Sequence, residues 1–75
     1  MRVTVNNISQ AIEERTGQPG ITLEKDAGVY YWVSDTNPVM EQLEERCTHM
    51  MRLSDWPLQR WVGDFESRLE MRTGY

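Results

Sequence analysis

The sequence predicts a small α+β domain, in which an antiparallel sheet of two or three strands packs against an N-terminal and a C-terminal helix. Two stretches near the ends of the chain carry apolar residues at helical spacing. Between them lies a β-branched and aromatic run, residues 29–33, which follows a turn-rich tetrapeptide at residues 25–28. Because 75 residues leave room for only one hydrophobic core, we expect a single domain over residues 1–75.

The first helix is expected over residues 5–16. Ile8 and Ile12 share one helical face, while polar and acidic residues occupy the opposite face. Thr4 has the side chain of a helix N-cap, and Gly17 suits the left-handed residue that commonly ends a helix.

Residues 21–24 alternate apolar and polar side chains, and together with residues 29–33 they predict a β-hairpin. The period of two places Tyr30 and Trp32 on one face of the second strand and Tyr31 on the other. Both faces therefore carry aromatic rings, and we expect one of them to be only partly covered.

The path of the chain after Pro38 has two interpretations. Apolar residues at helical spacing, among many good helix formers, favour a single helix over residues 38–51. In the alternative, a short helix over residues 38–45 is followed by a third strand at residues 47–53.

The C-terminal helix is expected over residues 57–70, with Ser54 or Asp55 as its cap. Residues 71–75 are expected to fray. One apolar stripe predicts the buried face of this helix, and it consists of Leu58, Trp61, Val62, Phe65 and Leu69.

Two further features of this helix follow from its sequence. Asp64 and Arg68 are four residues apart and are expected to pair on the exposed side. Gly63 is unfavourable inside a helix, which suggests a close neighbour against its bare backbone.

Composition limits the classes of function. Eight Arg and Lys residues against twelve Asp and Glu residues give a net charge of −4, which disfavours nonspecific binding of nucleic acid. Cys47 is the single cysteine, as expected in a reducing cytosol. No secretory signal pattern is present, and the longest apolar run, Val29 to Val33, is too short to span a bilayer. We expect a soluble cytoplasmic protein that does not associate with membranes.

The stretch from Met51 to Val62 reads Met-Arg-Leu-Ser-Asp-Trp-Pro-Leu-Gln-Arg-Trp-Val. Together with the aromatic run from Gly28 to Val33, it resembles a family of short uncharacterised proteins of bacteriophages and prophages. That family carries an N-terminal helix, an aromatic hairpin, a third strand ending in Arg-Leu, and a helix with Trp-Val. The resemblance implies the same fold and favours the third strand, because it resumes in register at Arg52-Leu53. This chain differs from the family pattern at residues 46–51, and the resemblance implies no activity or catalytic residues.

Cys47 and His49 are the only cysteine and histidine. A structural zinc site needs four ligands and a catalytic zinc site needs three from the protein. No third group that would orient His49 as a base for Cys47 is evident from the sequence. We therefore expect no metal, no cofactor and no catalytic residue.

Other polar and aromatic groups are candidates for binding. Glu41, Glu44 and Glu45 form either a solvated face or an acidic patch that meets a basic partner surface or imitates a phosphate backbone. Tyr30 and Trp32 either belong to the core or stack nucleic-acid bases.

Trp56 is a candidate interface anchor at the start of the C-terminal helix, with Met40, Met51 and Tyr75 as further members of an adhesive surface. The leading hypothesis is an accessory protein of a phage or prophage that binds another protein, such as a host or defence factor, in the bacterial cytoplasm. A nucleic-acid-binding module is the alternative, and a homodimer is compatible with either. The candidate partner-binding residues are Tyr30, Trp32, Glu41, Glu44, Glu45 and Trp56.

Overall fold

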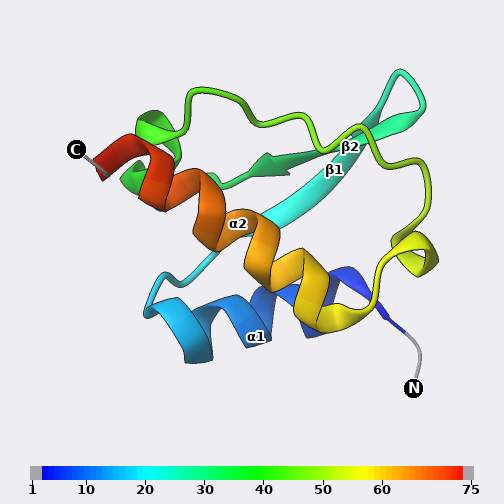
Figure 1. The fold of residues 1–75 in the computed structure, drawn as a ribbon, viewed down its shortest axis with the longest axis horizontal. Coiled ribbons are helices and arrows are strands. Elements are labelled where there is room, and N and C mark those ends of the chain that lie inside the picture. Colours follow the sequence, from blue (N-terminus) through cyan, green and yellow to red (C-terminus); the bar gives the residue numbers. More distant parts are fainter. Residues whose placement is uncertain (1–2, 74–75) are drawn as a thin grey trace.

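The computed structural model describes the backbone of residues 3–73 and the side chains of residues 3–69. The predicted α+β class is confirmed, because two helices pack against one face of a two-stranded antiparallel sheet (Figure 1). In chain order the elements are α1 (Val5–Thr16), β1 (Thr22–Asp26), β2 (Val29–Val33), the 3-10 helix η1 (Pro38–Gln42), the 3-10 helix η2 (Leu53–Asp55) and α2 (Leu58–Thr73).

Local capping chemistry sets both ends of α1, as predicted. The Thr4 hydroxyl accepts a hydrogen bond from the backbone N–H of Asn7 at 3.1 Å. At the other end, Gly17 adopts φ 76°, and its N–H donates to the carbonyl of Glu13 at 2.9 Å. A residue with a Cβ atom is strained at this angle, so Gly17 ends the helix without that cost.

The predicted hairpin forms with β1 and β2 joined by a two-residue loop. Ala27 and Gly28 have φ values of 52° and 83°, the signs that a tight hairpin turn with right-handed strand twist requires. The register pairs Leu23 with Trp32, and both side chains point to the helices and are buried.

The centre of the core is an aromatic cluster between β2 and α2. Trp32, Trp61 and Phe65 are fully buried. Trp32 meets Trp61 edge-on at 6.1 Å between ring centroids and lies 5.2 Å from Phe65. Rings in this geometry stabilise one another beyond the apolar area that they bury. In a chain this short, these three side chains hold α2 to the sheet.

The single helix over residues 38–51 does not form. The 3-10 helix η1 ends at Gln42, and Leu43 turns to extended backbone with φ −81° and ψ 123°. The guanidinium of Arg46 then donates to the carbonyl of Met40 at 2.9 Å, which satisfies the end of the short helix. The short-helix interpretation is therefore nearer to the structure.

The third strand that was expected after this short helix also does not form. One isolated antiparallel bridge joins Cys47 to Tyr31. Regular pairing stops there, because His49 adopts the left-handed φ of 60°, and the N–H of Tyr30 bonds to the carbonyl of Met50 at 2.9 Å. The chain follows β2 in the antiparallel direction, but it bulges away after a single pair (Figure 1).

The C-terminal helix begins later than predicted. Ser54 and Asp55 belong to η2, so neither caps α2. The carbonyl of Pro57 accepts instead from the N–H groups of Arg60 and Trp61, at 3.0 and 3.3 Å. At its other end the α2 backbone is helical to Thr73. Of the residues expected to fray, 74 and 75 lie outside the described part of the chain.

Gly63 has no close neighbour, contrary to expectation: a Cβ atom built on it would meet nothing within 4 Å. Gly63→Ala is therefore expected to raise the free energy of unfolding by about 0.5–1 kcal/mol, because alanine loses less backbone entropy in a helix. Urea unfolding followed by circular dichroism measures the change. Gly17→Ala is the matched control and should destabilise the fold, because it forces alanine to a positive φ. Equal effects of the two substitutions would contradict this account.

Candidate functional site

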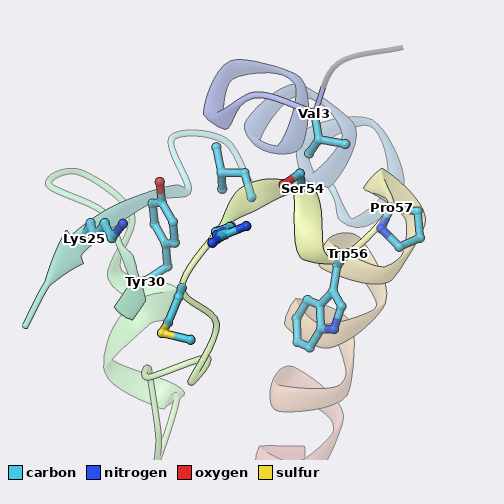
Figure 2. A pocket seen from close by; sticks show the side chains of 9 residues that line it. Val3, Lys25, Tyr30, Ser54, Trp56 and Pro57 are labelled. Atoms are coloured by element: carbon cyan, nitrogen blue, oxygen red, sulfur yellow. The ribbon is translucent and has the colours of Figure 1, made fainter. Parts of the chain in front are cut away.

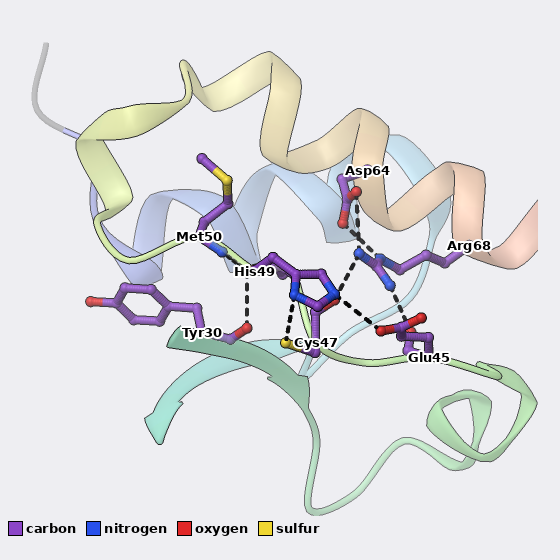
Figure 3. Close-up of polar contacts among 8 residues, drawn as sticks. Tyr30, Glu45, Cys47, His49, Met50, Asp64 and Arg68 are labelled. Atoms are coloured by element: carbon purple, nitrogen blue, oxygen red, sulfur yellow. Dashed lines mark hydrogen bonds and ion pairs between the residues drawn. The ribbon is translucent and has the colours of Figure 1, made fainter. Parts of the chain in front are cut away.

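Arg68 on α2 joins three segments of the chain (Figure 3). Its Nε donates to Asp64 Oδ2 at 2.7 Å. Its two terminal nitrogens donate to the backbone carbonyls of Glu45 and Cys47, at 2.8 and 3.1 Å. The same Asp64 oxygen accepts from the indole Nε1 of Trp32 at 3.0 Å. A fixed planar fork of donors suits one arginine to several acceptors at once.

The sequence predicted that Asp64 and Arg68 would pair on the exposed side of α2, but this position is wrong. The side chains of Arg68 and Asp64 are only 18% and 20% exposed. The pair is shielded from water, and the Asp64 carboxylate also accepts a hydrogen bond from a buried indole. It therefore contributes more to stability than an exposed pair four residues apart on a helix. Its role is to hold the segment after η1 against α2.

A second polar chain lies on the irregular segment beside β2 (Figure 3). His49 Nε2 is 3.3 Å from a carboxylate oxygen of Glu45, and His49 Nδ1 is 3.8 Å from the Cys47 sulfur. An ionised carboxylate only accepts hydrogen bonds, so the neutral imidazole carries its proton on Nε2. The lone pair of Nδ1 then faces the sulfur. The structure thus supplies the orienting group for His49 that the sequence did not reveal.

Tyr31 lies on the outer face of the sheet, which is the face opposite the helices. The negative charge of the Cys47 thiolate and a hydrogen bond to that sulfur raise the pKa of Tyr31 above its ordinary value. Because Tyr31 is only half-buried, its face is the partly covered aromatic face expected from the sequence. Cys47 lies beside Tyr31 on this face.

An open groove of about 800 Å³ lies where the hairpin and the start of α2 meet. Lys25 and Tyr30 of the hairpin line one side, and Trp56 and Pro57 line the other (Figure 2). The remaining lining residues are Val3, Met51, Arg52, Leu53 and Ser54. We call this the Tyr30–Trp56 groove.

The groove differs in charge from the rest of the chain. Among the described residues, its lining includes the cations Lys25 and Arg52 and no carboxylate, although the whole chain carries −4. Cations also lie against both aromatic rings: the Lys25 ammonium is 5.7 Å from the Tyr30 centroid, and the Arg60 guanidinium is 5.0 Å from the Trp56 ring. The groove therefore suits a ligand that combines apolar or aromatic groups with negative charge.

The predicted aromatic residues separate into surface and core. Tyr30 and Trp56 are partly exposed and line the same groove. Trp32 is fully buried and its indole N–H is satisfied by Asp64, so its inclusion among the partner-binding residues was wrong. The ring faces the helices because its register partner, Leu23, also points to the core.

The methionines separate in the same way. Met51, expected on an adhesive surface, is 61% exposed and lines the groove beside Trp56. Met40 is buried at 4% exposure, so its place on that surface was wrong. Tyr75 lies outside the described residues.

The acidic candidates Glu41, Glu44 and Glu45 are all exposed. Glu45 pairs with His49 through its side chain and accepts from Arg68 through its backbone carbonyl. Glu41 belongs to η1, and Glu44 to the turn that follows it. None of the three lines the Tyr30–Trp56 groove.

Two features are absent from the described residues. No group of three or more His, Cys, Asp or Glu side chains within residues 3–69 is arranged to hold a metal ion. In the same part of the chain, no helix has the length and apolar character needed to cross a bilayer.

Comparison of the chain with protein-family models, with curated proteins and with solved structures finds no significant match.

Sequence reasoning missed the cationic lining of the groove and the part of Glu45 in orienting His49. Lys25 and Arg52 are far apart in sequence and meet only in the fold. The spacing of Glu45 and His49 was the available signal, because side chains four residues apart interact on a helix. Residues 45–49 are not helical, so helical spacing does not explain the contact between Glu45 and His49.

Arg68→Ala is expected to lower the free energy of unfolding by about 2 kcal/mol, because the Asp64 carboxylate and two carbonyls lose a charged donor. Arg15→Ala is the matched control, since Arg15 pairs with Glu66 while 60% exposed, and it should change the value by about 0.5 kcal/mol or less. Chemical unfolding of both variants measures the difference. If Arg15→Ala costs as much as Arg68→Ala, the Arg68 network does not hold the segment.

Proposed function

We propose that this chain is a small accessory protein of a bacteriophage or prophage, which acts in the bacterial cytoplasm by binding another protein, such as a host or defence factor. The resemblance of residues 28–33 and 51–62 to such proteins supports the origin. The Tyr30–Trp56 groove supports the mode of action, because it offers a recognition surface without a recognised set of catalytic groups.

The observation that carries the proposal is that an exposed methionine and two partly exposed aromatic rings line one groove. Tyrosine and tryptophan are the residues that most often dominate the energy of protein interfaces. Met51, at 61% exposure, is the most exposed large apolar side chain of the described residues, and it adapts to irregular partner surfaces. Such a side chain costs free energy in water unless a partner covers it.

The rigid support of the groove is also consistent with binding. Trp56 packs on the buried Trp61 at 4.7 Å between ring centroids, so its ring is held in place before a partner arrives. The indole of Trp61 donates in turn to the carbonyl of Leu53 at 3.0 Å, which fixes the backbone of the groove floor. A preformed surface loses less entropy on association than a mobile one.

Peptides selected from a random display library against the folded domain are expected to combine aromatic or aliphatic residues with Asp or Glu. Met51→Glu should weaken their binding about tenfold or more, equivalent to about 1.4 kcal/mol, because it removes an apolar contact and repels acidic groups. Titration calorimetry with one selected peptide measures the change.

Gln59→Glu is the control for this experiment. It makes the same change of charge at an exposed position of α2 that does not line the groove. Binding should stay within about twofold of wild type. Equal weakening by the two substitutions, or selection of no peptide at all, would count against the groove as the recognition site.

Nucleic-acid binding remains the second candidate, because the groove combines two rings with two cations and lacks a carboxylate. Single-stranded nucleic acids bind to such surfaces by stacking and phosphate contacts. Quenching of tryptophan fluorescence by oligonucleotides, weakening as salt rises, is the expected sign. The overall charge of −4 and the loss of Trp32 to the core favour a protein partner.

A further inference from the structure

The pair of Cys47 and His49 lies outside the groove, on the segment that follows β2 (Figure 3). The Cys47 sulfur is 3.8 Å from His49 Nδ1. When a thiolate and an imidazole share one tetrahedral zinc ion, their bond lengths of about 2.3 and 2.0 Å place the two donor atoms about 3.5 Å apart. The observed separation is therefore close to the spacing of two ligands on one ion.

Glu45 gives His49 the orientation of a metal ligand. Its carboxylate accepts the Nε2 proton of the imidazole at 3.3 Å, which leaves a lone pair on Nδ1, the ring nitrogen that contacts the sulfur. Metal-binding histidines usually donate their second ring N–H to a carboxylate or carbonyl in this manner. The ring is also accessible, because 76% of the His49 side chain is exposed.

The backbone holds the two donor residues in place. The N–H of Thr48, between them, donates to the carbonyl of Tyr30 at 3.0 Å, and the Thr48 hydroxyl donates to the same carbonyl at 2.9 Å. Arg68 fixes the carbonyls of Cys47 and Glu45 from the other side. The pair is thus half of a tetrahedral site on a fixed frame.

We propose that two copies of this chain bind one divalent ion of the zinc class between them, each donating the Cys47 thiolate and His49 Nδ1. Two half-sites make the Cys₂His₂ set of a closed tetrahedral zinc centre. Two thiols lose their protons to solvent and form two zinc–sulfur bonds, so the two thiolates neutralise the charge of the ion.

A second copy fits this edge for two reasons. No helix of the described residues covers the outer face of the sheet, where Val29, Tyr31 and Val33 are only half-buried, so apolar surface adjoins the metal ligands. The carboxylates on the same face, Glu24 and Asp26, belong to β1. They lie about 10 Å, or two strand spacings, from the ligand segment. The nearer carboxylate, Glu45, pairs with His49, which limits its repulsion of a second acidic chain.

The full chain, purified free of metal and kept in a non-thiol reductant, is titrated with Co²⁺ and then with Zn²⁺. The expected result is a doubling of the mass by light scattering, with saturation at one ion for two chains. Bound Co²⁺ should show the intense visible absorption of a tetrahedral thiolate site. Cys47→Ser and His49→Ala should each abolish both signals, and circular dichroism checks that these variants fold.

Two carboxylate variants separate ligand orientation from charge alone. Glu45→Gln should weaken the affinity for Co²⁺ about tenfold or more, because the imidazole loses its carboxylate partner. Glu41→Gln makes the same change at an exposed glutamate of η1 and should leave the affinity unchanged. Equal effects of the two variants would show that Glu45 does not orient His49.

Three results overturn the proposal: no uptake of Co²⁺ at micromolar concentration, binding at one ion per monomer with no change of mass, or dimerisation that Cys47→Ser leaves intact. The Met51→Glu variant should still form the metal-bridged dimer, because Met51 lines the groove and belongs to neither half-site. Failure of this proposal therefore leaves the groove proposal standing, and the reverse also holds.

Discussion

The contact of Arg68 with Asp64 and with the carbonyls of Glu45 and Cys47 controls the form of the middle of the chain. Residues 34–57 contain two short 3-10 helices and one isolated bridge, so their own hydrogen bonds define little structure. Arg68 supplies the missing donors from α2. Asp64 joins this network to the buried indole of Trp32, so the irregular segment, the sheet and the helix are fixed by one set of bonds.

The small core explains why both candidate surfaces exist. The described residues, 3–73, form two α-helices to cover a two-stranded sheet, and both pack on the face that carries Trp32. The Tyr31 face is left without a layer, and the irregular segment covers only its edge. At the other end of the sheet, Trp56 packs on Trp61 and leaves the Tyr30–Trp56 groove open. Because a small domain buries a modest fraction of its surface, uncovered apolar groups remain on the Tyr31 face and in the groove.

The elements that were predictable are those set by neighbouring residues. Thr4 and Gly17 bound α1 through contacts within the same helix, and the hairpin follows from alternation and a turn. The path of residues 38–57 depends instead on Arg68 and on the carbonyl of Tyr30, which lie far away in the sequence. Periodicity carries no information about such bonds, so both sequence interpretations of this segment failed in part. For the candidate sites, Trp56 was selected from the sequence and is partly exposed in the groove, but sequence could not separate buried Trp32 from exposed positions.

The distribution of charge gives the two surfaces different chemistry within one acidic molecule. The groove presents Lys25 and Arg52 and no carboxylate, so the local field attracts anionic groups although the net charge is −4. The edge beside β2 presents a thiol and an imidazole with a carboxylate behind the ring, a donor set that attracts a soft cation. Two copies of this acidic chain repel one another, and the proposed shared cation would offset that repulsion at this edge. A metal-bridged pair would also carry two grooves, so the apparent affinity for a partner with repeated binding segments would rise without any new contact.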